Sequence, residues 1–240
     1  MKNKVSIVIP FYNCRFINEA IESALEQTYK NIEVVIVDDG STMHLDKVRP
    51  YVHLSKVRYV YKPNGGTATA LNRGIAVSKG EYFVWLSADD VIVRDKVEKQ
   101  LNFMLERNAY FSYTAYFHIN EHTQIVGEPI IQRFQTKISF VRTMLSGCPI
   151  NGSSVMIRMN VFSSIGCFDE LLLYTHDYDL WLRMLPHYEL YYLDEPLTLY
   201  RLHDGMGTKT HQLEIPPEIT YVQQRRKAAI EALIERGEIV

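Results

Sequence analysis

Short apolar runs alternate with amphipathic stretches along the first 107 residues of the chain. The apolar runs are continuous and rich in β-branched residues, which is typical of strands that are buried on both faces. The stretches between them repeat apolar residues at helical spacing. We therefore expect a mostly parallel sheet with helices on both faces. The expected strands are 4–10, 32–38, 57–62 and 81–86, and the expected helices are 15–29, 42–54, 67–78 and 93–105.

The pattern is less regular after residue 108, where it predicts a small antiparallel region beside the parallel sheet. The stretch LYYLDEPLTLYRLH predicts two short strands on either side of Glu195-Pro196, because proline interrupts a strand. The other expected elements are extended segments within 109–126, helices at 137–145 and 177–185, a strand at 153–158, and a charged amphipathic helix in the tail from residue 216.

Polar side chains gather where three of the expected strands end. They occupy residues 10–13, 38–41 and 87–90. Ligands of open α/β sheets bind beyond the carboxyl ends of the parallel strands. We therefore expect a ligand site at this edge of the sheet.

Composition excludes several classes of protein. The 240 residues carry a formal net charge of −2, without the basic field of a nucleic-acid-binding protein. The three cysteines (Cys14, Cys148 and Cys167) are scattered, which excludes a disulfide framework or a zinc site and favours a reducing compartment. The chain shows no signal peptide and no apolar run of the ~20 residues that span a bilayer. We expect a cytoplasmic protein without a nucleic-acid partner.

Two adjacent carboxylates, Asp89 and Asp90, follow the fourth expected strand in the stretch VWLSADD. Adjacent negative charges repel each other unless something neutralises them. Mg²⁺ and Mn²⁺ are often shared between one or two carboxylates and a substrate phosphate, so the pair predicts such a cation. A purely structural role in a turn or a helix cap also fits these residues.

Asp38-Asp39, at the end of the second expected strand, does not form a phosphatase site. Val37 stands where the nucleophilic aspartate of a DxDG motif is required. The phosphate-binding patterns GxxxxGK[ST] and GxGxxG are also absent from the sequence.

Three blocks of the sequence stand out by their order and spacing. They are VSIVIPFYNCRFINEAIESALEQTYKNIEVVIVDDGST, NGGTATALNRGIAVSKGEYFVWLSADD and NGSSVMIRMNVFSSIGCFDELLLYTHDYDLWLRM. Together they resemble glycosyltransferase family 2, the inverting, nucleotide-sugar-dependent transferases of the GT-A fold. The first is similar to the N-terminal block of that family, the second to the block that ends in the metal-binding acidic motif, and the third to the acceptor-side block. The resemblance runs from about Val5 to His203 and rests on the order and spacing of the blocks.

The resemblance implies roles for residues of a donor site. The loop after the first strand would pack against the nucleotide base, and Asp39 would accept a hydrogen bond from a base N–H. Asp89 would contact the ribose or the sugar, and Asp90 would hold a Mg²⁺ or Mn²⁺ ion that bridges the two phosphates. The implied nucleotide-binding residues are Pro10, Phe11, Tyr12, Asn13, Asp39, Asn64 and Asp89.

Further roles are implied in the second half of the chain. Asp177 would be the general base that deprotonates the acceptor hydroxyl. Arg201 and His203, in YRLH, would reach back to the diphosphate or the metal. Asp169 and Glu170 are expected on the acceptor side. The glycine-containing segment 204–211 fits either a lid that orders over substrate or a plain flexible loop.

Two positions depart from the commonest family pattern. Ser87 stands where many relatives carry the first aspartate of a DxD motif, which leaves the metal dependent on fewer carboxylates. His176 stands where glutamate is common, beside Asp177, whose pKa it would raise or lower according to its own protonation.

The resemblance implies transfer of a sugar from a nucleoside diphosphate-sugar, with a UDP-sugar favoured, to a sugar or lipid-linked sugar acceptor. Polysaccharide or glycolipid assembly is the expected context, and a lipid-linked acceptor would bring the protein to the inner face of the membrane. The expected organisation is a GT-A domain at 1–210, with a donor half at 1–107 and an acceptor half at 108–210. A helical tail at 211–240 follows and is a candidate dimer contact.

Two alternatives stay open. One is a catalytically degenerate, nucleotide-binding scaffold on the same fold. The other is a nucleotidyltransferase, although that class needs a Gly-rich loop with Arg or Lys after the first strand, where this chain has Phe11-Tyr12-Asn13-Cys14.

Overall fold

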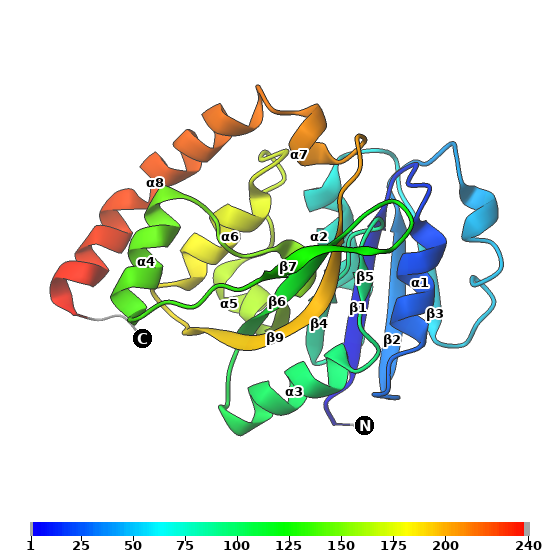
Figure 1. Ribbon diagram of the computed structural model, residues 1–240, viewed down its shortest axis with the longest axis horizontal. Helices are drawn as coiled ribbons and strands as arrows, with labels where there is room; N and C mark the ends of the chain where they lie inside the picture. Colours follow the sequence, from blue (N-terminus) through cyan, green and yellow to red (C-terminus); the bar gives the residue numbers. More distant parts are fainter. Residues whose placement is uncertain (1, 238–240) are drawn as a thin grey trace.

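The computed structural model describes residues 2–237 of the chain, and Figure 1 labels most of its helices and strands. Its strands are β1 (Val5–Phe11), β2 (Ile32–Asp38), β3 (Val57–Tyr61), β4 (Tyr82–Trp85), β5 (Val91–Ile92), β6 (Phe111–Ile119), β7 (Ile125–Ile130), β8 (Met156–Arg158) and β9 (Leu190–Arg201). Its helices are α1 (Ile17–Leu25), α2 (Thr67–Val77), α3 (Lys96–Glu106), α4 (Lys137–Ser146), α5 (Asn160–Ile165), α6 (His176–Met184), α7 (Gly207–Thr210) and α8 (Ile215–Arg236), with the 3-10 turns η1 (Leu45–Lys47) and η2 (Gly152–Ser154).

Within residues 2–237 the strands form one nine-stranded sheet in the order β3-β2-β1-β4-β8-β6-β9-β5, with β7 paired to β6. The four strands β1 to β4 run parallel to one another, as the alternating pattern predicts. β8 joins β4 antiparallel, and β6 pairs antiparallel with β8 but parallel with β9. The sheet therefore changes from a parallel first half to a mixed second half, which confirms the predicted fold class.

Successive residues of β1 point to opposite faces of the sheet, so this strand contributes to two cores. Ile7 and Ile9 pack with residues of α1 and α3 on one face. Val8 belongs to the core on the other face, which also contains residues of α2, α4, α6 and α8. Helices thus cover both faces of the sheet, as expected.

Several elements differ from the expectation. Residues 42–54 form only the short turn η1 instead of a helix. The two strands expected around Pro196 are one strand, β9, whose register against β6 shifts next to Pro196. Proline has no amide hydrogen to donate to a neighbouring strand, so a shift in register at this residue is expected. The short elements β5, α5 and α7 are not predicted by the sequence pattern.

The tail helix α8 packs against the rest of the chain, since Val222, Ile230 and Leu233 are buried and the first two belong to the core shared with α4 and α6. Part of the surface of this helix is therefore used within the chain. The dimer contact and the division at residue 211 stay predictions, and positions 238–240 of the tail lie outside the described residues.

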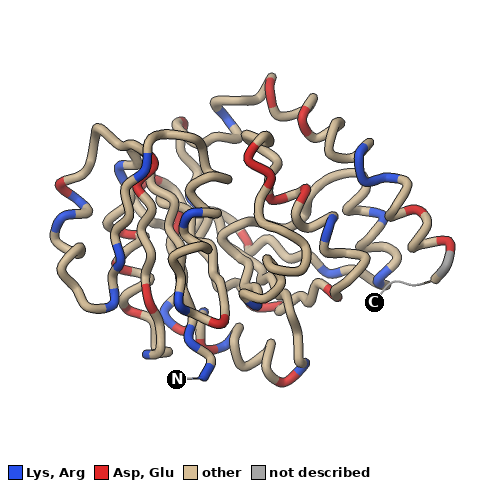
Figure 2. The backbone as a smooth tube through the Cα atoms, turned by 180° about the vertical axis from the view of Figure 1, so that it is seen from behind, with Lys and Arg blue, Asp and Glu red and all other residues tan. Residues whose placement is uncertain are grey.

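Both signs of charge are spread over the whole fold, as Figure 2 shows, in keeping with the small net charge. Among the described helices, none combines the length and the apolar character that crossing a membrane requires.

A lysine side chain is fully buried where α3 packs against β6. Lys96, the first residue of α3, has no exposed surface, and its Nζ donates to Gln100 Oε1 at 2.6 Å. Gln100 Nε2 in turn donates to the carbonyls of Ser112 and Ser154. Burial lowers the pKa of Lys96 to about 7, because an ammonium group loses its hydration there.

This lowered pKa predicts an unusual dependence of stability on pH. Between about pH 7 and the ordinary lysine pKa of about 10.4, the unfolded chain binds a proton at this side chain that the folded chain does not. The free energy of unfolding therefore gains a rising component across this range, with a slope that approaches about 1.4 kcal/mol per pH unit. Lys96→Met removes that component.

Urea unfolding of the wild type and of Lys96→Met at pH 7, 8, 9 and 10 measures the difference in slope. Tyrosines and cysteines that titrate in the same range are common to both proteins and cancel in the comparison. Parallel stability profiles would show that the lysine stays protonated in the folded protein.

Candidate functional site

The loops after β1 and β2 are tied together at the carboxyl edge of the parallel strands. Asn13, which has a positive φ of 49°, accepts hydrogen bonds through Oδ1 from the amides of Thr42 and Met43, both at 2.8 Å. Its own amide donates to Ser41 Oγ at 3.1 Å. Asparagine tolerates this left-handed conformation better than most residues. Asn13 therefore shapes the rim of the predicted nucleotide site.

Neighbouring residues of this loop point in different directions. Tyr12 is 55% exposed, so its ring is available to a ligand. Pro10 is half-buried. Phe11, in contrast, has no exposed surface and lies in the core beside α1 and α3. The expectation that the Phe11 side chain contacts a base does not fit this placement, and only its backbone faces the loop.

Asp39 is the centre of a hydrogen-bonded turn. Its carboxylate accepts from the amides of Gly65 at 3.0 Å and Gly66 at 2.8 Å, from Asn64 Nδ2 at 3.2 Å, and from Lys62 Nζ. Asn64 Nδ2 also donates to the Asp39 carbonyl at 2.9 Å. The Asn-Gly-Gly sequence makes this geometry accessible, because Gly66 has a φ of 89°.

The Asp39 carboxylate is buried, and the four donors occupy its acceptor positions. A base N–H could bind this carboxylate only by replacing one of them. Lys62 was not predicted as a site residue. Its position offers a signal, because it is a charged residue just after β3, at the same edge of the sheet as the acidic motifs.

Asp90 is enclosed by protein groups. It is 1% exposed and accepts hydrogen bonds from Ser153 Oγ at 2.5 Å and from the Arg201 amide at 2.9 Å. Burial, and then the nearby charge of Asp89, raise the pKa of Asp90 well above its usual range. This geometry does not fit the predicted metal ligand, because both oxygens already have protein partners and face away from solvent.

Asp89 is the accessible member of the pair. Its side chain is 27% exposed, and Oδ2 lies 3.0 Å from Nε2 of His203. The ring of Phe16 packs edge-on against the His203 ring, with centroids 5.2 Å apart. The carboxylate and the imidazole therefore lie next to each other at the end of β4, as a metal-binding role of His203 requires. Within residues 2–237 no larger group of His, Cys, Asp and Glu side chains suited to a metal ion occurs.

Arg201 is fully buried beneath this pair. Its guanidinium donates to the Asp89 carbonyl at 2.7 Å and to Glu19 Oε2 at 2.7 Å. Further bonds go to the turn between β6 and β7, at the Asn120 carbonyl and at Thr123 Oγ1. A contact of Arg201 with the diphosphate or the metal stays a prediction; in the structure its buried guanidinium binds protein groups around the site.

Asp177 lies in the first turn of α6, which is anchored to the end of β4. His176 is buried, and its ring centroid lies 5.7 Å from that of Trp85 and 5.7 Å from that of Phe168. Burial lowers the pKa of His176, so the neutral imidazole is favoured. Burial also raises the pKa of Asp177, which remains partly accessible.

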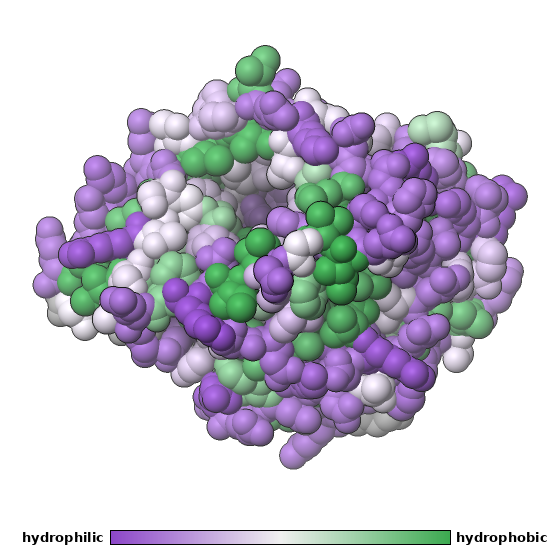
Figure 3. Space-filling view, viewed as in Figure 1, coloured by the Kyte–Doolittle hydropathy of each residue, from purple (hydrophilic) through white to green (hydrophobic). Residues whose placement is uncertain are grey.

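Figure 3 shows the molecular surface hollowed between α7 and β7.

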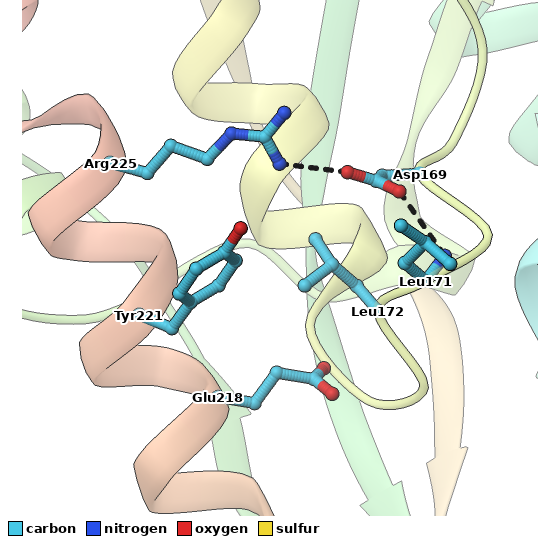
Figure 4. Close-up of a pocket in the computed structure, with 6 residues that line it drawn as sticks. All are labelled: Asp169, Leu171, Leu172, Glu218, Tyr221 and Arg225. Carbon is cyan, nitrogen blue, oxygen red and sulfur yellow. Dashed lines mark hydrogen bonds and ion pairs between the residues drawn. The ribbon is translucent and has the colours of Figure 1, made fainter.

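The two predicted acceptor-side carboxylates lie in the loop before α6, and both bind other parts of the protein. Asp169 forms an ion pair with Arg225 of α8, at 2.8 Å, and this hydrogen bond holds the pKa of Asp169 below its usual range. Glu170 accepts from Asn72 Nδ2 at 2.9 Å. Asp169 also lines a cleft of about 430 Å³ between this loop and α8, which Figure 4 shows.

Comparison with known proteins identifies relatives of this chain. The model of glycosyl transferase family 2 matches residues 6–166. An uncharacterized glycosyltransferase of Rickettsia typhi is 41% identical over 217 residues, which are 88% of this chain and 68% of that protein. TuaG of Bacillus subtilis, a putative teichuronic acid biosynthesis glycosyltransferase, is 39% identical over 119 residues, which are 48% of this chain and 47% of that protein.

A solved structure shares the fold. S. aureus TarS 1-349 in complex with UDP-GlcNAc superposes with a TM-score of 0.69 at 21% sequence identity, over 85% of this chain and 60% of that chain. The family match, the identity with the Rickettsia protein and this likeness agree with the three sequence blocks noted above. The chain therefore belongs to glycosyltransferase family 2, with the GT-A fold.

Proposed function

We propose that this glycosyltransferase transfers a sugar from a UDP-sugar to an acceptor hydroxyl with inversion at the anomeric carbon, in the assembly of a surface polysaccharide. The observation that carries the proposal is the position of the Asp89–His203 pair and of Asp177 at one edge of the sheet. Asp89 follows β4, and the contact of Trp85 with His176 brings the first turn of α6 to the end of the same strand.

The relatives support the substrate class. TarS has been crystallised with UDP and with UDP-GlcNAc, and TuaG is named for teichuronic acid biosynthesis. We infer a UDP-sugar donor for this chain by the same fold, and a saccharide acceptor that is either free or lipid-linked. The exposed ring of Tyr12 is available to stack on the base, and Asp39 would exchange one of its present donors for a base N–H.

The side chains at this edge fit a divalent cation if Asp89, rather than Asp90, is the carboxylate ligand. Asp89 Oδ2 and His203 Nε2 are already 3.0 Å apart and partly accessible, so one cation could replace the hydrogen bond between them. Mg²⁺ or Mn²⁺ would suit the carboxylate and the phosphate oxygens, and the imidazole favours a transition metal such as Mn²⁺. When bound, the cation would stabilise the negative charge of the departing diphosphate.

Asp177 is the proposed general base. Its raised pKa makes it a better proton acceptor than an ordinary aspartate. The carboxylate takes the proton of the acceptor hydroxyl as the oxygen bonds to the anomeric carbon. The bond between that carbon and the diphosphate oxygen breaks on the opposite face, and UDP leaves with the electron pair.

The metal assignment predicts a difference between the two adjacent aspartates. Asp89→Asn is expected to weaken manganese-dependent UDP binding by at least about tenfold, because the replacement removes a charged ligand. Asp90→Asn keeps a buried hydrogen-bond acceptor and is expected to retain that binding more fully. Calorimetric titration of each variant with UDP, with and without MnCl₂, measures the difference.

The opposite ranking would return the metal to Asp90 and contradict the assignment drawn from burial. Absence of UDP binding to the wild type, while the protein is folded, would favour the degenerate scaffold.

The proposed base predicts a loss of turnover without a loss of donor affinity. Asp177→Asn is expected to slow UDP release from UDP-GlcNAc by about 10²- to 10⁴-fold, the usual range for a general base. In the wild type the rate should fall as the pH drops through the raised pKa of Asp177, above the value of about 4 for an ordinary aspartate.

Release of UDP from a panel of UDP-sugars, with water or added saccharide as acceptor, gives the measurement. Asp46→Asn, at an exposed aspartate of the turn η1, is the matched control. Equal turnover by Asp177→Asn and the wild type would rule out this base.

A further inference from the structure

Glu218, in the first turn of α8, binds the segment that leads into α6. Its Oε1 accepts hydrogen bonds from the amides of Tyr174 at 2.8 Å and Thr175 at 2.6 Å, and from Thr175 Oγ1 at 2.8 Å. Its Oε2 accepts from the amide of Leu173 at 3.0 Å. Three consecutive backbone amides and one hydroxyl are thus bound by a single carboxylate that lies 43 to 45 residues away in sequence.

The bound segment ends at the N-terminus of α6. Thr175 is the N-cap residue of this helix, yet its side chain makes no capping bond to the helix and donates to Glu218 instead. A threonine hydroxyl at this position ordinarily accepts from an amide of the first turn. The position of the first turn, with Asp177 two residues beyond the cap, is therefore set by α8 as well as by α6 itself.

A second set of contacts fixes α8 against α6. Arg226 of α8 binds the fully buried carboxylate of Asp179, with Nε and Nη2 at 2.9 and 2.8 Å from Oδ1. Arg183 of α6 binds the other oxygen of the same carboxylate at 2.8 Å. Such a buried ion pair holds its partners in one arrangement, because separating them would leave a charge unpaired. Figure 4 shows the Glu218 side chain extending from α8 toward the loop before α6.

We infer that Glu218 is a positioning residue for the base Asp177, and that α8 is part of the active site and not a separate tail. The inference rests on the proposed function, because it takes Asp177 as the base. Asp177 must approach the acceptor oxygen to hydrogen-bonding distance, and misplacement of a reacting group by about 1 Å can slow a reaction by about 100-fold. Three amides without a partner would let the loop take other conformations.

The charge of Glu218 also acts on the base. Asp177 owes its raised pKa first to burial, and the negative charge of Glu218 raises it further. The ionisable groups that face Asp177 are His176 of α6, Glu218 of α8 and Cys148, which follows α4. Neutralising Glu218 while keeping its shape is therefore expected to lower the pKa of Asp177.

Two substitutions separate position from charge. Glu218→Ala removes the acceptor altogether and should reduce the turnover number for UDP release from UDP-GlcNAc by about 10- to 100-fold, with the KM for UDP-GlcNAc unchanged. Glu218→Gln keeps an amide oxygen for Tyr174 and Thr175 and should recover most of that turnover. In this variant the fall in rate on the acidic side of the pH profile should occur at lower pH, because the negative charge beside Asp177 is gone. Glu231→Gln, at an exposed glutamate of α8 that faces Lys227, is the matched control.

Hydrogen exchange tests the geometry independently of activity. The amides of residues 173–175 should exchange faster in Glu218→Ala than in the wild type or in Glu231→Gln, whereas the amides of the β1–β4 sheet should not change. Unchanged exchange at 173–175 would overturn the contact. Faster exchange combined with wild-type turnover and an unmoved pH profile would overturn the positioning role. Wild-type turnover in Asp177→Asn would instead remove the proposed base, and the role of Glu218 with it, while leaving the exchange result as a property of the fold.

Discussion

The candidate site depends on the interactions of one buried group, the guanidinium of Arg201. It lies at the end of β9, with Cζ 4.3 Å from the centroid of the Phe16 ring. Its N–H groups donate to α1, to the acidic motif and to the turn between β6 and β7. A fully buried arginine is tolerated only where most of its N–H groups find acceptors, and the planar fork of the guanidinium can satisfy several at once. The backbone amide of the same residue binds Asp90. One residue therefore joins the parallel half of the sheet to the mixed half just below the Asp89–His203 pair.

In this short motif one aspartate stabilises the protein structure and its neighbour remains accessible to a ligand. Asp90 is turned inward to Ser153 and to the amide of Arg201, whereas Asp89 remains at the surface beside His203. Two like charges next to each other in sequence are compatible because burial disfavours ionisation of the inner one. The serine at position 87 belongs to the same network, since its amide donates to Ser153 Oγ and its hydroxyl lies 3.1 Å from that atom. The Ser87 hydroxyl therefore contributes to the structure of the motif.

The sequence alone predicts the features that depend on local pattern. Continuous apolar runs give the strands β1, β2 and β4, and the polar residues after them lie at one edge, because parallel strands end together. It does not predict which of two adjacent aspartates faces the ligand, since that depends on a serine 63 residues and a backbone amide 111 residues further on. Lys62 and Glu218 were missed for a related reason. Each is an ordinary charged residue in its own neighbourhood, and each acquires a role only from a distant partner that folding brings to it.

The buried carboxylates of the site already accept hydrogen bonds from protein N–H groups. This limits the affinity that a nucleotide-sugar can gain by binding to them. Asp39 accepts from four N–H groups, and Asp89 is paired with His203. In the proposed binding mode a base N–H would replace an existing partner of Asp39, and exchange of one hydrogen bond for another contributes only about 1 kcal/mol. The larger part of the binding energy must then come from new interactions, which are stacking on the exposed ring of Tyr12 and charge neutralisation of the diphosphate. A nucleotide without a matching base N–H would leave the present contacts of Asp39 in place, so discrimination at this carboxylate would rest only on the difference between the hydrogen bond that is lost and the one that is gained.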